Sequence, residues 1–303
     1  VFKAINPTNN RLLAIKCFTK HVDNKQQRLE AVATYLNQQK SPYTLHYQYL
    51  PNELWVGNAE REDYYPILLM EWVEGETLGQ AVQKAAQQGD KARLQQLADN
   101  FTDLALWLLA QPIAHTDLKH DNILVKPNNS LVLIDYDGMF VPALANYPAE
   151  NKGVEEYQHP QRQLSDFNQH LDDFSIALIA AALYGLAQQP TLYNQYGSLD
   201  NLLFKGEDFK QPKNSPLWKA LQALHHPIIP PLLDQLLTAL QTNSLQLPRL
   251  STTLQPLPNT IQATEALIAQ KKQELLRLQK HLIHKKNAQK TKLPNVIQTT
   301  KRR

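Results

Sequence analysis

The feature that most constrains the fold is a pair of short apolar runs with polar residues at their ends. The runs "NILV" and "LVLIDY" are joined by "KPNNS", a cluster of turn formers, which predicts two strands and a short connection. Asp117, Lys119 and Asn122 come before or at the start of the first strand, and Asp135 lies near the end of the second. This polar segment is either a catalytic loop that leads into a strand or an ordinary turn stabilised by Asp and Asn side chains.

The pattern of apolar residues predicts strands and one helix in residues 1–70. "VFKAI" and "LLAIKCF" are separated by "NPTNN", which indicates a hairpin, and "YPILLMEWV" suits a buried strand. Between them, Leu29, Val32, Ala33 and Leu36 have the spacing of an amphipathic helix within "NKQQRLEAVATYLNQQ".

Long helical patterns dominate from Gly75 onward. Helices are expected at "LGQAVQKAAQQ", "LQQLADNFTDLALWLLA", "SPLWKALQALHH" and "PPLLDQLLTALQ", with a loop-rich stretch from Pro142 to Asp172. The apolar run Phe174–Ala187 has 14 residues. A membrane span needs ~20 residues, so we expect a buried core helix there and no transmembrane segment.

The composition is that of a soluble globular protein, with 43% apolar and 19% charged residues. Cys17 is the only cysteine, which excludes an internal disulfide and fits a reducing compartment such as the cytoplasm. Charge is unevenly distributed, because residues 259–303 have a net charge of +9 and residues 1–258 have −6. Residues 244–260 are rich in Pro, Ser and Thr, and we expect a linker there.

Transfer of a phosphoryl group from ATP needs several groups at one cleft. A cation must hold the phosphates, carboxylate and amide oxygens must hold Mg²⁺, and one carboxylate must orient the attacking hydroxyl. The chain supplies these groups in the motifs "LAIKCF", "HTDLKHDNILV" and "LIDYDG", which are followed by "DDFSIALIAAALYG". Each motif alone arises by chance in many chains, whereas their joint order is specific.

In this order the motifs resemble the signature of protein kinases, and the resemblance covers residues 1–250. It implies an α+β, two-lobed fold, with a small antiparallel sheet and one helix in the first lobe and mainly helices in the second. The implied divisions are a small lobe at 1–70, an inter-lobe linker at 71–76, a large lobe at 77–250, and a linker with a basic helical tail at 251–303.

The resemblance also implies which residues bind the nucleotide. Lys16 would hold the phosphates of ATP and pair with Glu30 on the following helix. Met70 would lie at the back of the pocket, and the backbone of Glu71–Val73 would hydrogen-bond the adenine edge.

The catalytic and metal-binding groups follow from the same resemblance. Asp117 would act as the base, and Lys119 would lie beside the transferred phosphate. Asn122 and Asp135 would bind Mg²⁺, with room for two ions. Asp173, at the start of the buried helix, would hold the backbone of the catalytic loop from below.

Among protein kinases, the chain is more similar to bacterial kinases of the eukaryotic Ser/Thr type than to well-known animal families. "LIDYDGMFVPAL" followed by "YQHPQR" resembles a group of bacterial kinase-like proteins with a D-Y-D-G metal motif, often joined to a further C-terminal module. The resemblance implies a signalling enzyme that uses ATP and Mg²⁺ and phosphorylates Ser or Thr of a protein substrate. Lys119, two residues after the base, is the pattern of kinases that act on Ser or Thr.

The sequence departs from the kinase signature in three ways. Thr116 replaces the Arg that usually pairs with a phosphorylated activation loop, and residues 135–160 contain no Ser or Thr. We therefore expect activity that does not require Ser/Thr phosphorylation of that loop.

Asp137 occupies the place of a Gly, as either an extra metal ligand or a surface charge. The Gly-rich loop that covers the phosphates should end near Val1, so we expect this sequence to begin inside a longer protein.

Two other functions remain open from the sequence. One is a kinase-like scaffold without catalysis, favoured by Thr116 and by the missing Gly-rich loop. The other is a small-molecule kinase of the aminoglycoside or choline type, which shares the Asp117–Asn122 and Asp135 pattern. The basic tail could bind nucleic acid or another anionic surface, or connect to an adjoining domain.

Overall fold

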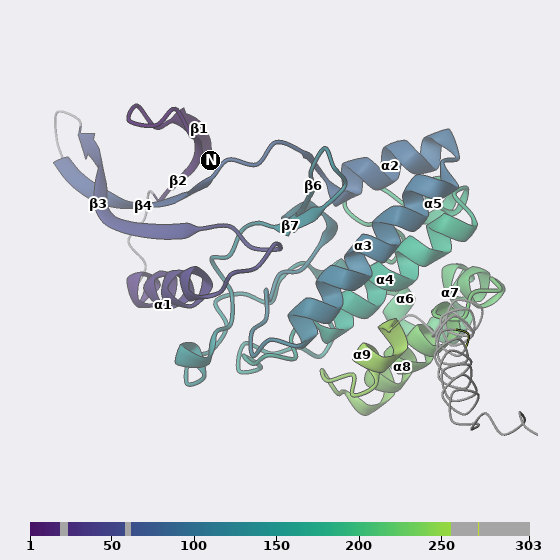
Figure 1. Cartoon of the computed structure of the whole chain (residues 1–303). Helices are drawn as coiled ribbons and strands as arrows, with labels where there is room; N and C mark the ends of the chain where they lie inside the picture. Colours follow the sequence, from purple (N-terminus) through teal and green to yellow (C-terminus); the bar gives the residue numbers. More distant parts are fainter. Residues whose placement is uncertain (19–23, 58–61, 256–271, 273–303) are drawn as a thin grey trace, which may run out of the picture. The chain divides into compact units, whose positions relative to one another are not determined.

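The structure is a computed structural model that describes residues 1–18, 24–57, 62–255 and 272 (Figure 1). Within these residues, the first part of the chain, the small lobe, is an antiparallel sheet with strand order β1-β2-β4-β3 and one helix. Its elements are β1 (Phe2–Ile5), β2 (Leu12–Cys17), α1 (Lys25–Gln38), β3 (Tyr47–Gly57) and β4 (Glu62–Glu71).

The amphipathic pattern of α1 explains where this helix lies. Leu29, Val32, Ala33 and Leu36 are all buried, as their spacing predicts. The helix packs against β3, so its apolar face covers one side of the sheet (Figure 1). The predicted hairpin of the first two strands is also confirmed, with Phe2 opposite Ile15.

The second part of the chain, the large lobe, is mainly helical. A small antiparallel sheet of order β5-β6-β7 lies at its start. The strands are β5 (Glu76–Thr77), β6 (Ile123–Val125) and β7 (Leu131–Leu133). The helices are α2 (Leu78–Gln88), α3 (Lys91–Leu109), α4 (Asp173–Gln188), α5 (Leu192–Tyr196), α6 (Gly206–Lys210), α7 (Pro216–Gln222), α8 (Ile229–Thr242) and α9 (Leu250–Leu254). One-turn 3-10 helices include His120–Asn122 and Glu155–Tyr157.

The apolar helix α4 is the centre of the large lobe. Its residues from Asp173 to Ala187 are buried, and it packs against α3 and α8. The predicted core helix and the predicted α+β class, with a small sheet lobe and a larger helical lobe, are therefore confirmed. No helix within the described residues is long and apolar enough to cross a membrane.

The expectation of a linker at 244–260 is wrong for its central part. Residues Leu250–Leu254 form α9, which packs against α3 and α8. Leu250 and Leu254 are buried, and Gln235 on α8 donates a hydrogen bond to Thr253 Oγ1 over 2.9 Å. The compact unit accordingly runs to Gln255. The Pro- and Thr-rich composition masked two buried leucines four residues apart. The basic helical tail predicted after this point lies outside the described residues, Lys272 excepted.

Because Leu254 is fully buried, its replacement should destabilise the whole large lobe. We expect Leu254→Ala to lower the free energy of unfolding by about 2–5 kcal/mol, measured by urea denaturation. Ser251→Ala, an exposed change on the same helix, should alter it by less than about 0.5 kcal/mol. Equal stabilities of the two variants would mean that α9 is a linker after all.

Candidate active site

Two carboxylates from the segment after β7 hold Lys16. The Nζ atom of Lys16 lies 2.7 Å from Oδ1 of Asp135 and 2.9 Å from Oδ2 of Asp137. Lys16 is on β2, a central strand of the small lobe, whereas both carboxylates belong to the large lobe. These ion pairs therefore join the two lobes at the place where the sequence predicts the phosphates of a nucleotide.

The predicted pairing of Lys16 with Glu30 is wrong for this structure. Glu30 is exposed on α1 and accepts a hydrogen bond from Gln26 Nε2 over 2.9 Å. Among the described residues, the carboxylates in contact with Lys16 are those of Asp135 and Asp137. A single Glu within reach along the sequence was the basis of the prediction, and the rotation of α1 about its axis was not predictable from that count.

Burial and charge act in opposite directions on these three groups. Burial disfavours the charged form of Lys16, but the carboxylates of Asp137 and Asp135 outweigh it, and the pKa of Lys16 is raised. For Asp135, burial is likewise outweighed by the hydrogen bond and charge of Lys16, so its pKa is lowered. Burial dominates at Asp137 and raises the pKa of that carboxyl. Asp135 is therefore the carboxylate that is more readily ionised.

The carboxylate of Asp117 is oriented from two sides. Asn122 Nδ2 donates to the backbone oxygen of Asp117 over 2.7 Å and to its Oδ2 over 3.2 Å. The backbone N–H of Val154 donates to Oδ1 over 3.1 Å, and Nζ of Lys119 lies 4.0 Å from Oδ2. A carboxylate has about four acceptor positions, so Asp117 can still accept a further proton donor such as a hydroxyl.

Gly153 permits the close approach of the Val154 segment to Asp117. Its φ is +71°, a left-handed conformation that glycine adopts without steric cost. A Cβ atom at this position would lie 2.9 Å from Gln158 Nε2 and 3.1 Å from Asp117 Oδ1. A side chain here would displace either the amide or the carboxylate, so glycine is required.

A buried carboxylate at the start of α4 supports the catalytic loop, as the resemblance implies, but it belongs to the preceding residue. Asp172, not Asp173, accepts hydrogen bonds from the backbone N–H groups of His115 and Thr116. Asp173 instead accepts from the backbone N–H of Leu247 over 2.9 Å, and burial raises the pKa of Asp173 to about 7. The sequence contains two adjacent aspartates, and nothing in it decides which one faces the loop.

Thr116 adopts a backbone conformation that is rare for a β-branched residue. Its φ is +70°, and such residues typically cost about 1–3 kcal/mol of strain. The conformation is held at three points. Asp172 accepts from its N–H, Arg162 Nη1 donates to its carbonyl over 2.7 Å, and its Oγ1 donates to Gly138 O over 2.7 Å. Thr116, one of the departures from the kinase signature, is thus held by three hydrogen bonds.

Arg162 links the catalytic loop to the segment that carries Val154. Its side chain is buried, and Nη1 also donates to Gln158 Oε1, while Nη2 donates to Asn151 O over 3.4 Å. Burial lowers the pKa of this guanidinium, although Asp172 and Asp117 favour its charge. The motif "YQHPQR" includes this residue, but the sequence offered no sign that its Arg points back to Thr116.

The tyrosine between the two aspartates is buried in the core. Tyr136 packs edge-on against Tyr47 and accepts a hydrogen bond from the backbone N–H of Leu45 over 3.0 Å. His115 Nε2 lies 2.8 Å from Ile134 O, so this buried histidine is fixed in the loop scaffold. These contacts set the position of the segment that presents Asp135 and Asp137.

The residues predicted to line an adenine pocket, Met70 and Glu71–Val73, lie at or just after the end of β4. Met70 is buried opposite Ala14 of β2. The N–H of Trp72 donates to Leu12 O over 3.1 Å, so it is not available to a nucleotide. Since successive residues of an antiparallel strand direct their backbone groups to opposite sides, Glu71, the last residue of β4, presents its groups away from β2. An adenine contact of the Trp72 N–H is therefore not available in this structure, and the contacts expected of Glu71 and Val73 stay predictions.

A comparison with protein families identifies the family of the chain. The family model described as "Protein kinase domain" matches residues 1–299. The chain belongs to the protein kinase family. A search of curated proteins finds no match. Membership in the family indicates a phosphotransferase that uses ATP and acts on protein substrates, and it agrees with the two-lobed α+β fold.

The kinase offers oxygen ligands that suit Mg²⁺. Asp135 is ionised readily and its side chain is 45% exposed, while Asn122 turns its amide nitrogen to Asp117. Among the described residues no group of three or more His, Cys, Asp or Glu side chains is arranged to hold a metal ion. Mg²⁺ in kinases is usually held by one or two protein oxygen ligands and by the phosphates of the nucleotide, so Asp135 with Asn122 fits that ion.

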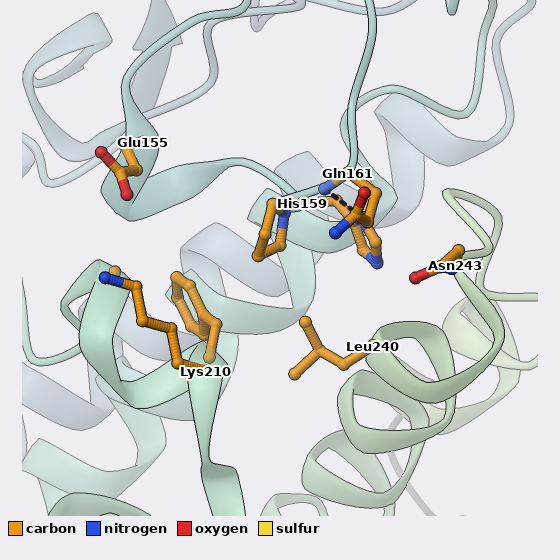
Figure 2. Close-up of a pocket in the computed structure, with 9 residues that line it drawn as sticks. Glu155, His159, Gln161, Lys210, Leu240 and Asn243 are labelled. Carbon is orange, nitrogen blue, oxygen red and sulfur yellow. Dashed lines mark hydrogen bonds between the residues drawn. The ribbon is translucent and has the colours of Figure 1, made fainter.

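A separate pocket of the kinase lies beyond the Val154 segment. It has a volume of 290 Å³ and is lined by side chains that Figure 2 shows on the segment after Gly153 and on α6 and α8. The labelled residues are Glu155, His159, Gln161, Lys210, Leu240 and Asn243. His159 is anchored there, with Nε2 3.2 Å from Ala239 O. The pocket contains none of the residues predicted for phosphoryl transfer.

The two adjacent aspartates give a matched test of the support under the catalytic loop. We expect Asp172→Asn to lower kcat roughly tenfold or more, because an amide has one acceptor oxygen and one loop N–H loses its partner. Kinase activity on a generic protein substrate measures the effect.

Asp173→Asn is the control for this experiment, since it is equally buried but contacts Leu247 instead of the loop. We expect it to keep the wild-type kcat. A larger loss of kcat in Asp173→Asn than in Asp172→Asn would contradict the assignment.

Proposed function

We propose that this kinase transfers the terminal phosphoryl group of ATP, with Mg²⁺, to Ser or Thr residues of proteins. The observation on which the proposal depends is the geometry around Asp117. Both of its carboxylate oxygens are oriented by fixed donors, and the Lys119 ammonium lies 4.0 Å away. This is the arrangement needed to orient a hydroxyl and to stabilise the charge of a transferred phosphoryl group.

Each predicted residue has a distinct task in this reaction. Asp117 accepts the hydrogen bond of the attacking hydroxyl, and Lys119 stabilises the equatorial oxygens of the phosphoryl group. Lys16 binds the phosphates of the nucleotide, while Asp135 and Asn122 hold the metal. The chemistry that Mg²⁺ held by these two residues would supply is positive charge to neutralise the phosphates. A site whose charged groups are already fixed needs little reorganisation during the reaction.

We also propose that the kinase does not need phosphorylation of residues 135–160 for activity. Arg162 supports this proposal, because a buried fixed cation already links Thr116 O to the segment at Asn151. The segment has no Ser or Thr, and the hydroxyls of two of its three tyrosines, Tyr136 and Tyr157, are buried in hydrogen bonds with Leu45 and Leu202. The hydroxyl of the third, Tyr147, donates to Gln27 at the surface. A phosphate on Tyr136 or Tyr157 would require local unfolding.

The resemblance to bacterial Ser/Thr kinases with a D-Y-D-G motif supports the same proposal. We also propose a role for residues 259–303, which have a net charge of +9. They contact nucleic acid or another anionic surface, or lead to an adjoining domain. If the partner is nucleic acid, its affinity for these residues should fall steeply as the salt concentration rises.

Transfer of labelled phosphate from Mg·ATP to a mixture of proteins tests the reaction. We expect label on Ser and Thr, and we expect Asp117→Asn and Lys16→Met each to lower the rate by roughly a hundredfold or more. Asp121→Asn is the matched control, since this exposed aspartate lies four residues further along the same loop, and it should leave the rate unchanged.

Three results would contradict the proposal in different ways. Label on tyrosine alone would exclude the Ser/Thr assignment. Label in small molecules but not in protein would indicate a small-molecule kinase. Binding of nucleotide without any transfer would indicate a catalytically inactive scaffold.

Phosphatase treatment tests independence from activation-segment phosphorylation. The treated kinase should retain its activity, because the segment is held by Arg162. Arg162→Lys, which cannot make all of these contacts, should lower kcat roughly tenfold with or without treatment. Arg249→Lys, at an exposed position, should behave like wild type. Loss of activity after phosphatase treatment would disprove this part of the proposal.

A further inference from the structure

The sequence left Asp137 with two roles, an extra metal ligand or a surface charge, and the structure favours neither. Its side chain is 17% exposed, compared with 45% for Asp135, so it is not a surface charge. Its Oδ2 lies 2.9 Å from Lys16 Nζ. The Asp137 carboxylate is therefore in direct contact with the ammonium group of Lys16.

The backbone around Asp137 is held from both sides. Tyr136 is fixed in the core, and Met139 N donates to Tyr136 O over 3.1 Å, which closes a turn that contains Asp137. Gly138 O accepts from Thr116 Oγ1. The residue of the motif with a positive φ is Asp135, at +65°, and Asp137 does not need the conformational freedom of glycine. The carboxylate of Asp137 is therefore pre-positioned.

The helix of the small lobe is engaged elsewhere. Arg28 Nη2 donates to Pro148 O over 2.6 Å, and Lys25 Nζ lies 2.9 Å from Glu150 Oε2. Tyr147 Oη donates to Gln27 Oε1 over 3.1 Å. These contacts fix the rotation of α1 with Glu30 on its exposed face, away from Lys16. A carboxylate from α1 could reach Lys16 only if they were broken.

The two carboxylates on Lys16 are not equivalent in the proposed reaction. Asp135 is the exposed one that would turn to the metal, whereas Asp137 is enclosed. We propose that Asp137 is the positioning residue that holds Lys16 for the nucleotide phosphates, in place of a glutamate from α1. This inference rests on the proposed function for its catalytic consequence, but its effect on nucleotide binding can be measured without catalysis.

A double-mutant cycle on the full chain tests the inference. Nucleotide affinity is measured by calorimetry with Mg·ATP for wild type, Asp137→Asn, Lys16→Met and the double variant. We expect Asp137→Asn to weaken binding roughly tenfold, and to have no further effect in the Lys16→Met background, because the carboxylate acts through that lysine. Asp137→Glu, which keeps the charge, should recover part of the affinity, and Glu30→Gln should bind like wild type.

The alternatives predict different results. If Asp137 were a metal ligand, Asp137→Asn would raise the Mg²⁺ concentration needed for binding and would act equally in the Lys16→Met background. If its charge merely repelled the phosphates, Asp137→Asn would tighten binding. A loss in Glu30→Gln as large as that in Asp137→Asn would restore the helix glutamate as the partner. Each of these results, or an Asp137→Asn variant indistinguishable from wild type, would overturn the inference.

The catalytic arm separates this inference from the proposed function. Asp137→Asn should raise the KM for ATP roughly tenfold. The Mg²⁺ concentration that gives half-maximal kcat should change far less. If wild type binds nucleotide with the expected coupling but transfers no phosphate, the proposed function fails and the role of Asp137 stands. If wild type binds no nucleotide, both fail.

Discussion

The site depends on one buried carboxylate, that of Asp172 at the start of α4. It accepts two backbone N–H groups of the catalytic loop, and in this way it fixes Thr116 in a left-handed conformation that the residue would not adopt alone. Thr116 in turn precedes Asp117, so the direction of the carboxylate that we propose as the catalytic base follows from a contact beneath the loop. A buried carboxylate is costly unless its oxygens are fully used. Burial raises the pKa of Asp172, and the two N–H donors and the nearby charge of Arg162 offset only part of this desolvation.

The large lobe supplies nearly all the rigidity of the site, and the small lobe contributes chiefly Lys16. Arg162 ties the loop to Asn151, and Gly153 brings the next N–H onto Asp117. Tyr136 fixes the segment that carries Asp135 and Asp137 in the core. The result is a set of polar groups that are already oriented before any ligand arrives. Preorganisation of this kind is where electrostatic catalysis gains its advantage over water, because no dipoles have to turn during the reaction.

The amphipathic helix and the core helix were predictable because burial leaves a periodic trace in the sequence, as Leu29 to Leu36 show. Motif order likewise predicted that Lys16 and Asp135 meet, although 118 residues separate them. Three details were not predictable. The first is which of the adjacent residues Asp172 and Asp173 supports the loop. The second is the direction of the Glu30 side chain, which depends on the rotation of α1. The third is the role of Arg162, which donates to backbone carbonyls that have no sequence signature. β3 was also missed as a separate strand, since Pro51 and Asn52 interrupt its pattern at a register shift between Leu50 and Leu54.

Arg28 has a consequence for motion between the lobes. This guanidinium is buried, lies over the rings of Tyr147 and Phe167, and donates to Pro148 O. An outward swing of α1 has to break the aromatic contacts and the hydrogen bond together, at roughly 1–2 kcal/mol each. These contacts of Arg28 therefore disfavour movement of α1 away from residues 147–148 and Phe167. Because Lys25, Gln27 and Arg28 all contact residues 147–150, an outward movement of α1 would also have to displace that segment.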